Sequence, residues 1–273
     1  MRVPTILLHL VPAALYALLA AHFWRRRDAQ PPAGGMAAWE RIALAAVLGV
    51  HGWGLYGEML PGAGMRFGFG LALALVLWLA LVFYWLQSWF ARIEGLQMLV
   101  LPVAAVCALL PVAFPAQHEL IRAGLPLFRA HFLVAMLAYG LFTLAALHAM
   151  LMAVAERRLH RGRLSRAFLR LPPLLTMETL LFRLVWIAFG LLTLTLASGI
   201  LFSEEVFGKP LQFDHKTLFA LVSWVIFAGL LAGRAAWGWR GRTALKWTIA
   251  GFATLLLAYV GSRFVLEVIL GRA

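Results

Sequence analysis

Eight long runs of apolar residues alternate with short polar segments along the chain. A helix needs about 20 predominantly apolar residues to cross a bilayer. The shortest run, 96–114, contains Pro102 and Pro111. The pattern predicts an all-α polytopic membrane protein, a bundle of about eight transmembrane helices at 4–24, 38–58, 67–88, 96–114, 131–155, 179–202, 216–236 and 246–268.

The polar segments are too short to hold a separate soluble domain. We therefore expect residues 1–273 to form a single integral membrane domain, with four spans in 1–115 and four in 131–268. The first run is long and is followed by Arg25, Arg26 and Arg27. These features favour a retained anchor over a cleaved signal peptide.

Basic residues predict the orientation of the bundle. With eight spans, sixteen Lys and Arg fall on one side, fourteen of them in the loops 25–41, 156–178 and 234–246, and eight fall on the other. Cytoplasmic loops are enriched in Lys and Arg. Both termini are therefore predicted to be extracytoplasmic.

Composition excludes several classes of protein. Of the 273 residues, 63% are hydrophobic and 13% are charged, whereas soluble domains carry about 25% charged residues. Cys107 is the only cysteine, which excludes a disulfide scaffold. The net charge of +13 is assigned to topology and to contact with the lipid bilayer, and nucleic acid is not expected as a partner.

Motifs for enzymes and ion-coupled carriers are missing. All eleven Asp and Glu fall in loops or near the ends of the predicted helices, whereas proton- or sodium-coupled carriers usually need a carboxylate at membrane depth. The chain contains no P-loop, HExxH, GxSxG or CxxC motif and no close Cys/His cluster for zinc. The eight histidines are the remaining candidates for chemistry.

His131 and His215 each open a predicted span on the same side of the membrane. Two imidazoles at equal depth can hold one haem iron from opposite sides, with aromatic side chains as walls. The aromatic candidates nearby are Phe128, Phe132, Tyr139, Phe207, Phe213, Phe219 and Trp224. Asp214 could hydrogen-bond a ring N–H and fix its tautomer. Histidines in an ordinary aromatic belt would show the same spacing.

His51 lies near the middle of the second span, where a polar side chain needs a partner. A ligand and a hydrogen bond to a neighbouring helix are both open as that partner. His148 lies 17 residues after His131, about 25 Å deeper at 1.5 Å per residue, so it could join only a second, deeper site with His51. The other four, His9, His22, His118 and His160, are expected to be structural or interfacial.

The C-terminal half resembles a known family. The segments that carry the resemblance are HFLVAMLAYGLFTLAALHAMLMAVA at 131–155, LPPLLTMETLLFRLVWIAFGLLTLTLASGILF at 171–202, DHKT at 214–217 followed by FALVSWVIFAGLLAGR, and GWRGR at 238–242. They resemble the histidine-led helix, the Pro-led loop with its Leu-Leu-Thr helix and the Asp-Pro-Lys helix of the cytochrome c assembly family of haem-handling membrane proteins, which includes CcsA- and CcmC-like members. The HGWGLY segment around His51 is a weaker upstream match.

Three departures matter for mechanism. The segment SEEVFGKPLQFDHK at 203–216 has no tryptophan where haem-delivery members are tryptophan-rich, Gly233 stands where a second intramembrane histidine often occurs, and the C-terminal VLEVILGRA lacks the outer histidine. The chain is therefore most similar to the HemX-like or YpjD-like branch. His131 matches a family ligand position. His215 stands where the family has proline, so its role as a ligand is inferred from geometry alone.

The resemblance implies haem as the cofactor and haem binding, delivery or regulation linked to cytochrome c assembly. The location it implies is the inner membrane of a bacterium. The partners it implies are other cytochrome c biogenesis or haem-pathway membrane proteins. Catalysis on a diffusible substrate is not expected. The alternative is a membrane scaffold or accessory subunit without bound haem, and a small-molecule transporter is disfavoured.

Overall fold

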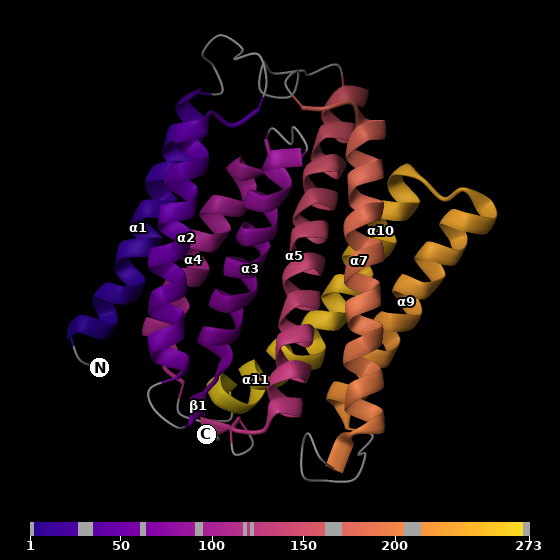
Figure 1. Ribbon diagram of the computed structural model, residues 1–273. Coiled ribbons are helices and arrows are strands. Elements are labelled where there is room, and N and C mark those ends of the chain that lie inside the picture. Colours follow the sequence, from indigo (N-terminus) through magenta and orange to yellow (C-terminus); the bar gives the residue numbers. More distant parts are fainter. Residues whose placement is uncertain are drawn as a thin grey trace.

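The computed structural model describes residues 3–26, 35–60, 64–90, 95–116, 119–120, 123–161, 171–204 and 214–269. Eight helices of 16 to 35 residues dominate this part of the chain and run back and forth between two ends of a bundle (Figure 1). Their bounds are α1 (Val3–Arg26), α2 (Ala38–Met59), α3 (Phe69–Phe90), α4 (Gln97–Ala113), α5 (Pro126–His160), α7 (Leu174–Leu201), α9 (His215–Trp237) and α10 (Gly241–Leu256).

Both termini lie at the same end of the bundle, the lower end in Figure 1. We call this the terminus end and the other the opposite end. Six helical segments in the described residues are long and apolar enough to cross a membrane: α1, α3, α5, α7, α9 and the segment from Gly241 to Ile269. The all-α prediction is confirmed. About eight transmembrane helices were predicted; eight long helices are present in the described residues, and six segments qualify as candidate membrane spans.

The other two helices, α2 and α4, differ from these six. α4 is apolar but has only 17 residues, matching the run that was shortest in the sequence. α2 has 22 residues and carries Glu40, Arg41 and Glu58. Both helices still pass between the ends of the bundle beside longer neighbours (Figure 1).

The chain after α10 stays helical but changes its winding. π-helical turns at η1 (Leu257–Gly261) and η2 (Val265–Ile269) flank the short α11 (Ser262–Phe264). This segment lies near β1 at the terminus end (Figure 1). β1 (Met65–Arg66) pairs antiparallel with β2 (Glu119–Leu120), and this small sheet was not predicted.

α5 is the longest helix and occupies a central position. It packs against α3, α7 and α10, and its 35 residues span about 52 Å, which exceeds the roughly 30 Å of a hydrocarbon core. Small residues allow close packing around it, since a Cβ on Gly140 would lie 2.7 Å from the Leu79 Cβ. Deeper in the bundle, Phe142 of α5 stacks on Phe227 of α9 with ring centroids 3.9 Å apart.

α1 and α2 meet along a seam with heptad spacing. On α2, buried or half-buried residues recur at intervals of four and three: Glu40, Leu44, Val47, His51, Gly54 and Glu58. On α1 the matching buried set is His9, Ala13, Tyr16, Ala20 and Phe23. Such spacing keeps one face of each helix toward the other. Gly54 allows a close approach, because a Cβ there would lie 3.2 Å from the Leu8 carbonyl oxygen.

Candidate cofactor site

His131 lies in the second turn of α5 at the terminus end and is half-buried. Its Nδ1 lies 2.8 Å from the hydroxyl oxygen of Ser198 in the last turn of α7. The Ser198 hydroxyl donates its one proton to the Thr195 carbonyl oxygen at 3.0 Å. With the hydroxyl proton on Thr195, Ser198 accepts from Nδ1–H, and the lone pair of neutral His131 is then on Nε2.

An aromatic cluster begins beside His131. The neighbouring Phe132 stacks on Phe128, with ring centroids 6.3 Å apart, and meets the edge of Phe67 at 4.8 Å. Phe67, in the turn before α3, is fully buried and contacts Tyr259 of η1 at 5.8 Å. The aromatic cluster therefore joins α5 to the start of α3 and to the C-terminal segment.

Two other predicted aromatic residues, Tyr139 and Trp224, join further pairs of helices. Tyr139 donates to the Leu255 carbonyl oxygen at 2.9 Å, which joins α5 to α10. Trp224 stacks on Phe189 at 5.4 Å and donates to the Thr193 hydroxyl at 2.9 Å, which joins α9 to α7. Phe207 and Phe213 are outside the described residues.

His215 is the first residue of α9 and is exposed. α5 and α9 both begin at the terminus end (Figure 1), and α7 packs against both helices. His131 and His215 therefore lie at the same end of the bundle, on helices that share α7 as a neighbour.

Asp214 caps the start of α9. Its carboxylate accepts a hydrogen bond from the backbone N–H of Thr217 at 2.9 Å, as expected for an N-cap aspartate. Burial alone would raise the pKa of this carboxyl, but the bonds to Thr217 and the nearby Lys216 and His215 hold the pKa below its usual value. The carboxylate fixes the helix terminus that carries His215.

His51 is fully buried in the α1–α2 seam. Its Nδ1 lies 3.1 Å from the Tyr16 hydroxyl, so a hydrogen bond to a neighbouring helix supplies a partner. Its Nε2 is buried without a hydrogen-bond partner among the described residues. One heptad along the same seam, the buried His9 pairs through Nε2 with the Glu58 carboxylate. Sequence reasoning missed this pairing, although the four–three spacing on α2 was a signal for it.

His148 is also buried, but it faces a different neighbour. Its Nε2–H donates to the Met177 carbonyl oxygen at 2.9 Å, which joins α5 to α7. Its Nδ1 has no hydrogen-bond partner within the described chain. His51 and His148 thus bond to α1 and α7 respectively, and their hydrogen bonds do not bring them into one deeper site.

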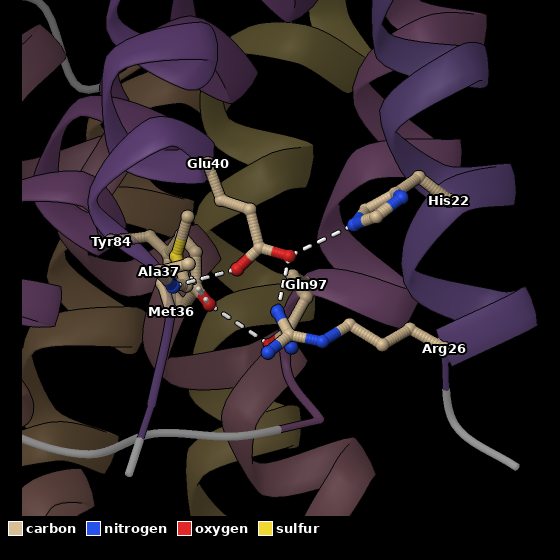
Figure 2. Close-up of polar contacts among 7 residues, drawn as sticks. All are labelled: His22, Arg26, Met36, Ala37, Glu40, Tyr84 and Gln97. Atoms are coloured by element: carbon tan, nitrogen blue, oxygen red, sulfur yellow. Dashed lines mark hydrogen bonds and ion pairs between the residues drawn. The ribbon is translucent and has the colours of Figure 1, made fainter. Parts of the chain in front are cut away.

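A second polar cluster lies in the α1–α2 seam at the opposite end of the bundle (Figure 2). Glu40 is fully buried and accepts from His22 Nε2 at 2.8 Å, from the Ala37 N–H at 2.7 Å and from Arg26. Beside it, Tyr84 of α3 donates to Gln97 of α4 at 2.9 Å (Figure 2). His22, expected at an interface, is in fact a partner of a buried carboxylate. His118 is outside the described residues.

Glu178 forms a comparable cluster at the opposite end between α7, α9 and α10. It accepts from Arg234 at 2.8 Å and from the Gly241 N–H at 3.2 Å. The Arg234 guanidinium also lies over the Phe182 ring, 4.6 Å from its centroid. Glu40, Glu58 and Glu178 lie near helix ends, as predicted, yet each is paired with a cation or an imidazole. No group of three or more metal-ligating side chains occurs within the described ranges.

The molecule is therefore a multi-pass helical membrane protein with a half-buried histidine and an aromatic cluster at one end. Residues 43–270 match the family model of the cytochrome C assembly protein, and the chain belongs to that family. The resemblance predicted from the sequence is thereby confirmed. α1, with His9, Tyr16 and His22, lies outside the matched residues.

Curated relatives support the same placement. The chain is 31% identical over 176 residues to the inner membrane protein YpjD of Escherichia coli K12, covering 63% of this chain and 65% of the relative. It is 33% identical over 179 residues to an uncharacterized 28.8 kDa protein of Azospirillum brasilense, covering 64% and 66%. This chain thus spans just under two thirds of the length of both relatives.

A more distant relative is the cytochrome c biogenesis protein CcsA of Prochlorococcus marinus MIT 9215. The match is 36% identical over 88 residues, which is 32% of this chain and 28% of the relative. No solved structure matches the chain significantly. The inner-membrane relative and the six candidate spans place the protein in the inner membrane as a multi-pass protein.

Proposed function

We propose that the protein binds haem at the terminus end of the bundle and holds or passes it on in cytochrome c assembly. His131 is the first axial ligand in this proposal, and His215 is the second. The observation that carries it is the chain of hydrogen bonds from His131 through Ser198 to Thr195. Metal-binding histidines usually donate their second ring N–H to an acceptor in this way.

The residues at this end fit a haem. With Nδ1 bonded to Ser198, Nε2 of His131 is the ring nitrogen proposed to bind iron. The imidazole is half-buried, near the end of the bundle. Phe128, Phe132 and Phe67 supply the flat apolar surface that can wall a porphyrin. When bound, haem iron would supply ligand exchange and electron transfer.

His215 is the less constrained of the two ligands. It is exposed at the start of α9, and Asp214 fixes that start through Thr217. An exposed imidazole costs little to move, so His215 could serve as the ligand that is exchanged when haem is taken up or released. His51, with a buried Nε2 that lacks a partner in the described residues, is the next candidate ligand.

The alternative is a scaffold or accessory subunit that binds no haem. The paired polar clusters at Glu40 and Glu178 would serve such a role equally well, because they join helices without needing a cofactor. Partners in either role are proposed to be other membrane proteins of cytochrome c biogenesis or the haem pathway. This proposal extends to the chain what the names of the CcsA relatives say of those proteins.

The experiment is purification in detergent from haem-replete cells, followed by an absorbance spectrum and a haem extraction assay. We expect a Soret band and a substoichiometric to equimolar haem content. A protein that is folded by circular dichroism and remains colourless even after added haem would favour the scaffold.

A further inference from the structure

The carboxylate of Glu267 lies at the start of α3, although the two segments are far apart in sequence. Its Oε2 accepts from the backbone N–H of Phe69 at 2.8 Å, and its Oε1 accepts from Nη1 of Arg263 at 3.3 Å. In Figure 1 the C-terminal helical segment carrying both side chains lies next to β1, directly before α3. The C-terminal segment is thus held to α3 through one carboxylate.

Three features make this place a binding site for a carboxylate. The N-terminus of α3 carries partial positive charge and unsatisfied N–H groups. Gly68 leaves room for the oxygens, because a Cβ there would lie 3.1 Å from Glu267 Oε2 and 3.2 Å from the Ala116 Cα. Nε of Arg263 is buried and lacks a hydrogen-bond partner in the described chain. The guanidinium therefore has a donor that Glu267 does not use.

The same place is continuous with the surroundings of His131. The Arg263 guanidinium lies 5.8 Å from the ring centroid of Tyr259, which contacts Phe67. Phe67 in turn meets Phe132, the residue after His131. An aromatic path thus leads from the imidazole to the guanidinium.

We propose that Phe69 N–H, Gly68 and Arg263 form a subsite for a haem propionate, and that Glu267 occupies this subsite until a propionate displaces it. The inference rests on the proposed function, because it assigns the carboxylate edge of the same ligand. Two carboxylates in one subsite repel each other. Glu267 therefore leaves when the propionate enters, and one carboxylate replaces another at the same cation without a change in local charge.

The test compares haem with its dimethyl ester, which keeps the iron and the flat ring but has no carboxylates. Both are titrated into the purified full chain, and the wild-type protein is compared with Glu267→Gln and Arg263→Gln. Glutamine keeps the size of Glu267 but removes the competing charge, so we expect Glu267→Gln to bind haem about tenfold more tightly. Arg263→Gln should bind haem about tenfold more weakly. The affinity for the ester should change little in both variants.

One control variant and one further subsite variant separate this effect from altered folding. Glu156→Gln removes a carboxylate that pairs with Arg242 at the opposite end, and it should leave both affinities unchanged. Gly68→Ala places a methyl group against the carboxylate position, so it should weaken binding of haem but not of the ester. Amide hydrogen exchange supplies a readout other than affinity. Haem, but not the ester, should raise the rate of amide hydrogen exchange in residues 262–269 of the wild-type chain.

The results distinguish the two proposals. If haem and the ester bind equally well and respond alike to all variants, His131 still holds haem but the carboxylate subsite is wrong. If neither compound binds the wild-type protein, the proposed function fails, and the subsite fails with it.

Discussion

Ser198 and His131 form a hydrogen bond between α7 and α5. The Ser198 hydroxyl oxygen lies 2.8 Å from Nδ1 and 3.0 Å from the Thr195 carbonyl oxygen, and with its proton donated to Thr195 it accepts from the imidazole. The two residues are 67 positions apart and lie on α5 and α7. In the proposed haem site, this serine, one turn from the end of α7, would orient the histidine at the start of α5 for coordination through Nε2.

The first prediction concerns Ser198→Ala. Removing the acceptor leaves Nδ1–H without this bond, so the ring is less basic and less well oriented. We expect haem affinity to fall by about tenfold and the reduction potential to shift, while the helical content stays unchanged. Titration and spectroelectrochemistry measure these two effects.

The control for that variant is Thr254→Val. Thr254 is half-buried, and within the described residues its hydroxyl bonds the Ala250 carbonyl of its own helix. It should therefore bind haem as the wild-type protein does. An unchanged affinity and potential in Ser198→Ala would mean that the hydroxyl does not prepare His131 for ligation.

The second prediction compares two buried tyrosines. Tyr16→Phe removes the one hydrogen-bond partner of His51 among the described residues, so we expect the free energy of unfolding in detergent to fall by about 1 kcal/mol. Tyr139→Phe removes a bond to the Leu255 carbonyl and should cost a similar amount. Thermal denaturation measures both losses.

The two tyrosine variants should differ in their effect on haem. Tyr139 lies beside Tyr259 and the C-terminal segment, whereas Tyr16 lies in the α1–α2 seam. Neither variant touches His131, so both should keep the Soret band of the wild-type protein. A band shifted only in Tyr16→Phe would instead identify His51 as an iron ligand.

The third prediction contrasts two arginines. Arg157 is exposed in the last turn of α5, and Arg157→Lys should be nearly silent because lysine keeps the charge near the headgroups. Arg234 donates to Glu178 and to the Trp239 carbonyl and lies over Phe182. Arg234→Lys loses this planar geometry and should destabilise the protein by about 1–3 kcal/mol. Equal melting temperatures for both variants would contradict the structural role of Arg234.

The helices were predictable because apolar runs of about 20 residues have few other structures in a membrane. The predicted 38–58 and 216–236 agree closely with α2 and α9. The predicted 131–155 was too short at both ends, because α5 begins at Pro126 and continues to His160 among arginines. Hydropathy detects the membrane core but not the helical turns that extend beyond it.

Partners across helices were much less predictable. The pairs His9–Glu58 and Tyr16–His51 depend on α1 lying antiparallel to α2 in one register. The bond from Ser198 to His131 depends on α5 packing beside α7. The carboxylate of Glu267 lies in the π-helical C-terminal segment and bonds the start of α3, which is distant in sequence. A single sequence contains no direct record of such neighbours.

The fourth prediction concerns orientation. The excess of basic residues in loops 25–41, 156–178 and 234–246 predicts that the opposite end of the bundle is cytoplasmic and that both termini are outside. Reporter fusions after Ala155 and after Phe202 should report opposite sides, with Ala155 inside. An exported reporter after Ala155 would reverse the orientation and place His131 and His215 on the cytoplasmic side.

The most direct test of the central claim is the absorbance spectrum of the haem-loaded protein in four forms: wild type, His131→Ala, His215→Ala and the double variant. Neither histidine lies in the middle of a helix, so all four should insert and fold. We predict that each single variant keeps haem weakly with a shifted Soret band, and that the double variant binds none. An unchanged spectrum in the double variant would contradict ligation by His131 and His215.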